Sequence, residues 1–242
     1  MNKSEFLSLG KFKKTIFCQL MQKEIVTAIL TLLIFNSMQG QLNFPERSVG
    51  IIAFTYNDSG KGKIKGTGFV FMQNNFVISA EHVLDGAGDY KSIFYNPLSD
   101  KSEFIPLEIY FVDKSADIVI FKSLYPITDD FLETTSFDEL EPGDEIHYIG
   151  YNVDSGEFRT ALGVILSKGK IKSNHINTEF INFRGDNVIG GYSGGPILSK
   201  ESKLVGILSS TFYFSEKADG EKFKITRGFT LQPAEDKIKS EH

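Results

Sequence analysis

Short apolar runs separated by turns constrain the fold of this chain most strongly. From residue 48 onward, β-branched and aromatic residues gather in short stretches that end at clusters of Gly, Asn, Asp or Ser. No stretch sustains the 3.6-residue apolar period of an amphipathic helix. Such strands, closed by turns at short intervals, are typical of all-β sandwiches and barrels. We therefore expect strands at residues 49–56, 61–72, 76–79, 90–95, 104–112, 117–122, 145–151, 158–167, 170–173, 178–183, 197–198, 204–210 and 222–229.

These strands fall into two halves. An acidic, irregular connection at 127–140 separates a first half, about 47–126, from a second half, about 141–235. One helical turn near 80–84 and a short C-terminal helix complete the expected elements. Hydrophobic residues make up 41% of the 242 residues and charged residues 24%, which is ordinary for a globular protein. The formal net charge is −5 and no basic block is present, so nothing indicates a nucleic-acid-binding protein.

The first 40 residues are expected to be an export leader. Residues 25–35 form an uncharged apolar run, which is shorter than the ~20 residues that span a bilayer and matches the ~7–15 apolar residues of a signal peptide. Gly40 and Gln41 would flank the cleavage site. Because the positive region before the run is unusually long, we hypothesise that translation starts at Met21. The alternative is a buried core helix, but that would show polar positions at helical spacing.

A glycine-rich segment presents a single serine. Residues 190–196 read Gly-Gly-Tyr-Ser-Gly-Gly-Pro, with Ser193 at the centre. Glycines free the backbone to adopt positive φ and let its N–H groups approach a ligand closely. The pattern suits a nucleophilic hydroxyl on a tight turn, with bare amides beside it for an oxyanion. On this segment alone, a glycine-rich hairpin turn with an incidental serine remains the alternative.

A serine nucleophile needs a base to take its proton, and histidine is the commonest. Of the four histidines, His242 is terminal, His147 lies in the middle of an expected strand, and His175 lies in a polar turn. His82 follows a buried-looking strand at the point where the chain bends. Such a side chain is rigidly held but accessible, so we expect His82 to be the base.

The base in turn needs a carboxylate to fix its tautomer. Asp117 immediately precedes the apolar run at 118–121, so its charge should be partly buried, and buried acids are normally paired. Asp113 is the competitor, but the adjacent Lys114 makes its position resemble a surface turn. We therefore favour Asp117.

Five motifs in this order resemble those of the trypsin-like serine peptidases. They are Gly-Thr-Gly-Phe at 66–69, Ile-Ser-Ala-Glu-His at 78–82, Ala-Asp-Ile-Val at 116–119, Gly-Tyr-Ser-Gly-Gly-Pro at 191–196 and Leu-Val-Gly-Ile at 204–207. The order His, Asp, Ser is that of chymotrypsin-type triads. The resemblance covers about 47–235 and is closest to the compact, cysteine-free bacterial branch that includes the Deg-type proteases.

The resemblance implies an all-β fold of two six-stranded antiparallel β-barrels, with the site in the cleft between them, in a peptidase domain of 41–242. It implies a serine endopeptidase that acts through an acyl-enzyme. Ser193 would be the nucleophile, His82 the general base and acid, and Asp117 the orienting carboxylate. The backbone N–H groups of Gly191 and Ser193 would form the oxyanion hole. No metal or organic cofactor is implied, and the partner would be a polypeptide substrate. With the leader, the expected location is secreted or periplasmic in a bacterium, with membrane contact only through an uncleaved leader.

The resemblance also places a primary specificity pocket. In the family it is lined by the residue six before the serine and by the strand that follows Val-Gly-Ile. These positions map to Asn187 and to Ser209, Ser210 and Thr211. Asn187 is not an acid, so a preference for Arg or Lys is not expected, and Thr211 replaces a glycine and narrows the pocket. We expect cleavage after small or medium-sized uncharged residues.

Three departures from the family pattern carry expectations. Tyr192 takes the place of the aspartate that, in the digestive enzymes, pairs with a new N-terminus, so a cleavage-driven switch is not expected. Glu81 replaces a small residue beside His82, and its charge should raise the pKa of that histidine. No PDZ-like pattern follows the peptidase region, so Deg-type peptide sensing and cage assembly are not expected.

A second enzyme class shares part of the serine motif. The Gly-x-Ser-x-Gly pattern also fits the nucleophile elbow of α/β-hydrolases. That elbow leads into a helix, which Pro196 and the following strand pattern contradict, and the fold needs its histidine after the serine, where only His242 lies. We therefore reject that interpretation. Two alternatives stay open: a catalytically inactive pseudoprotease that binds peptides or acts as a scaffold, and an active protease that cuts one dedicated partner.

Overall fold

The computed structural model describes residues 48–55, 62–85, 91–96, 104–173, 176–185, 188–215 and 222–240. The expected leader lies outside these ranges, as do Asn187, His175 and His242. Within the described ranges, no helix has the length and apolar character needed to cross a membrane. The same ranges contain no group of three or more His, Cys, Asp or Glu side chains that could hold a metal ion.

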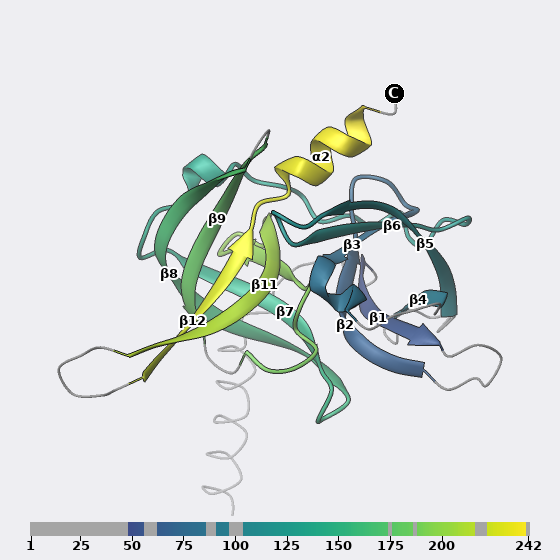
Figure 1. Ribbon diagram of the computed structural model, residues 1–242, viewed down its shortest axis with the longest axis horizontal. Helices are drawn as coiled ribbons and strands as arrows, with labels where there is room; N and C mark the ends of the chain where they lie inside the picture. Colours follow the sequence, from purple (N-terminus) through teal and green to yellow (C-terminus); the bar gives the residue numbers. More distant parts are fainter. Residues whose placement is uncertain are drawn as a thin grey trace, which may run out of the picture. The chain divides into compact units, whose positions relative to one another are not determined.

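The first barrel is built from six antiparallel strands: β1 (Val49–Thr55), β2 (Gly62–Val70), β3 (Phe76–Ala80), β4 (Lys91–Tyr95), β5 (Phe104–Asp113) and β6 (Ile118–Lys122). They close in the order β1-β2-β3-β6-β5-β4 (Figure 1). Strand β3 is buried at every position and β6 at all but its last, which explains why both are mainly apolar in the sequence. The barrel core includes Ile52, Val70, Val77, Phe94 and Phe121.

The second barrel is built from β7 (Glu145–Asn152), β8 (Glu157–Ser173), β9 (Ile176–Gly185), β10 (Pro196–Ser199), β11 (Leu204–Ser215) and β12 (Lys222–Phe229). It closes in the order β10-β11-β12-β9-β8-β7 (Figure 1), again with antiparallel pairs throughout. Its core includes Ile146, Tyr148, Phe183, Ile197 and Leu208. A 3₁₀-helix at Phe137–Glu139 lies in the connection between the barrels.

A third apolar cluster joins both barrels to the C-terminal helix α2 (Gln232–Lys239). It combines Phe69 and Ile118 of the first barrel with Ile149 and Ile207 of the second, and with Ile238 of the helix. Fully burying one such side chain contributes about 1.5–3 kcal/mol. The barrels therefore share a continuous core, which fixes the loops that meet between them.

The expected fold class is confirmed: the chain forms two six-stranded antiparallel barrels followed by a short helix. The expectation of separate strands at 158–167 and 170–173 is wrong, because β8 is one strand of 17 residues that pairs with β7 and β9. Its register to β9 shifts between Ile165 and Ser167. Such an irregularity bends a strand and increases its twist. One long, bent strand can therefore pair with both β7 and β9.

Candidate active site

Strand pairing brings His82 and Asp117 together. Strands β3 and β6 run antiparallel with Ala80 opposite Ile118, so the end of one meets the start of the other. His82 follows in a 3₁₀-helix at Glu81–Leu84, which is anchored by the buried Val83. The backbone N–H of Glu81 donates to the Asp117 carbonyl at 3.0 Å, and that of His82 donates to Asp117 Oδ1 at 2.9 Å. These two bonds hold the segments of His82 and Asp117 together, in addition to the contact between the imidazole and the carboxylate.

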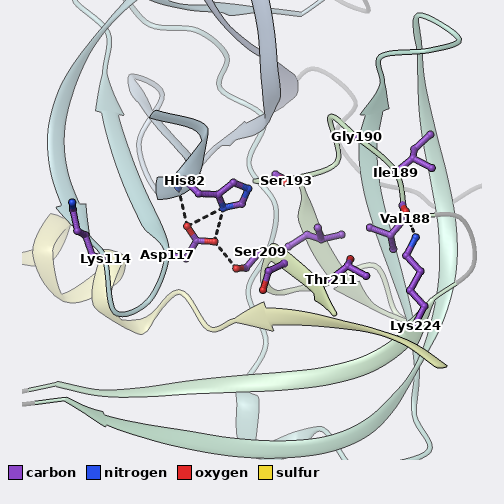
Figure 2. Close-up of a pocket in the computed structure, with 12 residues that line it drawn as sticks. His82, Lys114, Asp117, Val188, Ile189, Gly190, Ser193, Ser209, Thr211 and Lys224 are labelled. Carbon is purple, nitrogen blue, oxygen red and sulfur yellow. Dashed lines mark hydrogen bonds and ion pairs between the residues drawn. The ribbon is translucent and has the colours of Figure 1, made fainter. Parts of the chain in front are cut away.

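The imidazole of His82 faces the Asp117 carboxylate (Figure 2). Its Nδ1 lies 2.8 Å from Oδ2 and 3.1 Å from Oδ1. The hydroxyl of Ser209 donates to the same Oδ2 from the second barrel. Because a carboxylate only accepts hydrogen bonds, Nδ1 must carry a proton. In the neutral ring, Nε2 is then the nitrogen that can take a proton.

The backbone of Asp117 is unusual, with φ of +50°. This left-handed region is rare for non-glycine residues, although Asp tolerates it better than most. Asp117 ends the turn between β5 and β6, and its conformation accompanies a carboxylate that faces His82. Strain of this kind often accumulates at functional sites.

The pair shifts the pKa of both partners. The hydrogen bond to Asp117 raises the pKa of His82 against the opposing effect of burial, and the charges of Asp117, Asp85 and Glu81 act in the same upward direction. Burial opposes ionisation of Asp117, but hydrogen bonds from His82 and Ser209 outweigh it and lower the pKa of this carboxyl. The expected effect of Glu81 on His82 is present as a smaller contribution.

Asp113, the competing carboxylate, does not reach His82. Its Oδ1 accepts bonds from the backbone N–H and the hydroxyl of Ser115 at 2.9 and 2.7 Å and from the N–H of Ala116 at 3.2 Å. Asp113 is buried, whereas Asp117 is half-buried. Asp117 is partly buried, as expected, but the expectation that Asp113 lies in a surface turn is wrong, because Asp113 is the more buried of the two. The contact with His82, rather than burial, distinguishes Asp117 from Asp113.

The glycine segment forms a tight turn before Ser193. The N–H of Tyr192 donates to the Ile189 carbonyl at 3.3 Å, and Gly191 has φ of +95°. A positive φ at the third residue, with none at Gly190, is the signature of a type II turn. Among the described residues, the N–H groups of Gly191 and Ser193 have no hydrogen-bond acceptor. Two donors therefore remain available beside the serine hydroxyl.

Gly194 fixes this segment against the first barrel. It has φ of +84°, and its N–H donates to the Leu208 carbonyl at 2.8 Å. A Cβ at this position would collide with the Ser79 hydroxyl and the Thr67 carbonyl. Only glycine combines this conformation with so close a contact, so the serine is held where the two barrels meet.

One cavity of about 560 Å³ collects most of the predicted site residues. Its lining includes His82, Asp117, Ser193, Ser209, Ser210 and Thr211, together with Lys114, Val188, Ile189, Gly190, Leu208 and Lys224 (Figure 2). Asn187 lies outside the described residues, and His147 is absent from the lining. In the described part of the chain, no hydrogen bond joins His82 to the Ser193 hydroxyl.

Thr67 was not predicted to have a role, yet it connects the barrels at the site. Its hydroxyl donates to the Gly191 carbonyl at 2.7 Å and accepts from the Tyr151 N–H at 2.9 Å. Its N–H donates to the Ser193 carbonyl at 2.8 Å. The only sequence signal is its place between Gly66 and Gly68, which marks close backbone approach. Thr67 therefore holds the carbonyl groups of the turn whose Gly191 and Ser193 N–H groups have no acceptor in the described part of the chain.

The comparison with protein families agrees with this geometry. The model described as "Trypsin-like peptidase domain" matches residues 66–207, more than half of the chain. The chain belongs to the trypsin-like peptidase family.

Curated relatives of this peptidase are named as DegP-like proteases. A "Probable periplasmic serine endoprotease DegP-like" of Chlamydia muridarum is 24% identical over 196 residues, covering 72% of this chain and 38% of the relative. The protein of the same description from a Marinomonas species is 26% identical over 180 residues, covering 73% and 36%. The chain thus spans less than two fifths of the length of these relatives.

Solved structures share the peptidase fold. An "HtrA-type protease AlgW with decapeptide" superposes with a TM-score of 0.63 at 16% identity, covering 82% of this chain and 65% of that one. The active form of the protease Rv3671c from M. tuberculosis gives a TM-score of 0.57 at 21% identity, with 78% of each chain covered. At these identities the likeness supports the double-barrel fold.

Tyr192 is packed as a core residue of this peptidase. It is only 1% exposed, its ring meets that of Tyr148 edge-on at 6.1 Å between centroids, and it covers Gly150. Burial raises the pKa of its phenol. The position before the serine is thus occupied by aromatic packing, and the absence of a cleavage-driven switch stays a prediction.

Removing the Thr67 hydroxyl is expected to destabilise the protein. Thr67→Val keeps the shape but leaves the Gly191 carbonyl and the Tyr151 N–H without a partner. Each such group costs about 1–3 kcal/mol, so we expect the free energy of unfolding in urea to fall by about 2–6 kcal/mol. The turn should also loosen, which would slow labelling of the serine by a fluorophosphonate probe.

Thr178→Val is the matched control for Thr67→Val. Thr178 is also fully buried, but its hydroxyl has no hydrogen-bond partner among the described residues, so this variant should unfold at the same or a higher urea concentration than the wild type. Equal stability and equal labelling rates for the two variants would contradict the role assigned to Thr67.

Proposed function

We propose that this chain is a serine endopeptidase that cleaves polypeptides through an acyl-enzyme. Ser193 is the nucleophile, His82 the general base and acid, and Asp117 the carboxylate that orients the imidazole. The observation that carries the proposal is the Nδ1–carboxylate pair, at 2.8 Å, in the same cavity as the serine.

Acylation uses the neutral imidazole. With Nδ1–H bonded to Asp117, the lone pair on Nε2 takes the proton of the Ser193 hydroxyl while Oγ attacks the substrate carbonyl carbon. The carbonyl oxygen becomes an oxyanion, which the unpaired N–H groups of Gly191 and Ser193 stabilise. Collapse of this intermediate expels the amine, which receives its proton from the imidazolium.

Deacylation repeats these roles with water. His82 removes a proton from a water molecule, the resulting hydroxide attacks the ester carbonyl, and Ser193 leaves with the proton returned by His82. The raised pKa of His82 means that its charged form, created in each half-reaction, is stabilised by Asp117. The bond between His82 and Ser193 would then form as substrate closes the cavity, because catalytic hydrogen bonds often tighten only in the complex.

The proposed location and domain organisation follow from the N-terminal region and the relatives. We propose a leader at 1–40 and a peptidase domain at 41–242 that acts outside the cytoplasm. The apolar run at 25–35 supports this, as does the word "periplasmic" in the names of the relatives. A polypeptide substrate is supported by the family and by the AlgW protease, whose structure is described with a decapeptide.

An inactive peptide-binding module is the second candidate. The observation that favours it is that no hydrogen bond joins His82 to the Ser193 hydroxyl within the described ranges. In that case the cavity and its free N–H groups would bind peptide carbonyls without turnover.

A fluorophosphonate probe tests the proposed function. The purified full chain should be labelled, Ser193→Ala should not, and labelling should persist in Ser155→Ala, which alters an exposed turn. Circular dichroism would show that each variant is folded. If the folded wild type resists labelling and cleaves no peptide, the proposal is wrong and the binding module is favoured. Labelling without cleavage of casein would indicate a protease with one dedicated partner.

A further inference from the structure

The cavity holds a lysine that the sequence analysis did not use. Lys224 lies on β12, where Tyr213 pairs with Lys224 and Thr211 pairs with Thr226. Residues two apart on a strand face the same side. Thr226 is fully buried and its hydroxyl lies 3.3 Å from that of Thr211. Lys224 therefore shares the face of the sheet that lines the cavity, as the lining confirms.

The ammonium of Lys224 is only partly satisfied. Its Nζ donates to the Val188 carbonyl across the cavity wall. An ammonium has three N–H donors, so two remain after this bond. No carboxylate among the described residues pairs with it, although its side chain is half-buried. A partly buried cation that pairs with no carboxylate among the described residues favours an anionic ligand.

The position of the Lys224 charge relative to Ser193 indicates a role in binding the substrate. The close-up shows His82 and Ser193 on one side of the lining and Val188 with Lys224 on the other (Figure 2). Val188, Ile189 and Leu208 form an apolar part of the wall of the same cavity. A substrate whose carbonyl lies at Ser193 would direct the side chain before the scissile bond along this wall toward Lys224.

We infer that Lys224 makes this peptidase select a glutamate or aspartate immediately before the scissile bond. The methylene groups of the side chain contact the apolar wall, and the carboxylate pairs with the ammonium. This inference rests on the proposed function and replaces the expectation of an uncharged residue, which was drawn from Asn187, Ser209, Ser210 and Thr211 without this lysine.

The other lysine in the lining does not offer the same charge. Lys114 lies near Asp117, its side chain is 84% exposed, and its Nζ is 3.8 Å from the Glu81 carboxylate. The charge of Lys114 is therefore solvated and lies close to the opposite charge of Glu81. An exposed ion pair of this kind contributes little free energy. Lys114 therefore provides a matched control, since its replacement removes one positive charge from the same cavity but from the opposite side.

Peptides that differ only before the scissile bond test the inference. For the wild type, kcat/KM for Glu should exceed that for the isosteric Gln by about 10- to 100-fold, as expected for a hydrogen bond to a charged group. In Lys224→Gln the ratio should fall to about one, and in Lys224→Glu a Lys peptide should be preferred. Lys224→Arg should retain a preference for Glu, and Lys114→Gln should leave the ratio within about threefold.

A binding measurement keeps this test independent of turnover. The Ser193→Ala variant should bind the Glu peptide with a Kd about 10-fold or more below that of the Gln peptide. Equal Kd values, or a wild-type library profile dominated by uncharged residues, would overturn the inference. Failure of all peptides to be cleaved, together with no fluorophosphonate labelling, would overturn the proposed function instead, and a tighter Kd for Glu would still support the role of Lys224.

Discussion

Replacing Ser193 with alanine is expected to lower kcat for peptide hydrolysis by at least about 10³-fold. The variant keeps the cavity and the backbone N–H groups of residues 191 and 193, so it retains substrate binding and a residual stabilisation of the oxyanion. What it loses is the covalent route, which no neighbouring side chain replaces. Steady-state hydrolysis of a fluorogenic peptide measures kcat, and KM should change little.

His82→Ala is the companion variant, because the two side chains act as a unit. It should fall to a similar residual rate, and the double variant should be hardly slower than either single variant. Multiplicative losses would indicate that the side chains act separately. Turnover of either single variant within about tenfold of the wild type would contradict the assignment.

The sequence predicts those parts of the fold in which local pattern and burial agree. Strand β3 is buried on both faces and β6 at all but its last residue, so both stand out as mainly apolar runs. Strand β8 was divided in the prediction because Lys168 and Gly169 interrupt its apolar pattern. It nevertheless continues, since β9 pairs with it on both sides of the interruption. Long-range pairing of this kind leaves no local signal.

The residues of the candidate site can also be divided into those that a local sequence pattern indicates and those that it does not. His82 and Ser193 could be proposed as site residues because their neighbours in the sequence form a strand end and a glycine turn. Asp117 was chosen over Asp113 for its burial, whereas in the structure the two residues differ in where the backbone directs their side chains. Asp113 caps its own turn, and Asp117, at φ of +50°, faces His82. A burial argument cannot distinguish two acids four residues apart in one turn.

Thr67 and Lys224 escaped prediction because their partners are distant in the sequence. Thr67 bonds to Gly191, 124 residues away, and Lys224 to Val188, 36 residues away. In the sequence, Lys224 alternates with apolar residues, which is typical of the solvent face of a strand. Only the closure of the second barrel turns that face toward the cavity.

Asp117→Asn is expected to lower kcat by about 10³- to 10⁴-fold and to move the pH profile. The base works only when neutral, so kcat/KM rises as pH increases through the pKa of His82 in the free enzyme. The hydrogen bond and charge of Asp117 raise that pKa. Without the charge of Asp117 the pKa of His82 falls, so the rising limb of the pH profile should shift to lower pH. The maximal rate should stay low, because the amide introduced by Asp117→Asn no longer fixes the His82 tautomer that carries its proton on Nδ1. Rates measured between about pH 5 and 9 would show both effects.

Asp113→Asn separates this electrostatic role from a structural one. It changes a buried carboxyl in the same turn, one that bonds to Ser115 and Ala116 rather than to His82. We expect it to lower stability while leaving the rising limb at the wild-type pH. Ser209→Ala, which removes a bond that lowers the pKa of Asp117, should give a smaller loss of kcat than Asp117→Asn. If the limb stayed in place in Asp117→Asn, or moved equally in Asp113→Asn, the carboxylate would not be acting through His82, and the observed pair would be a structural contact alone.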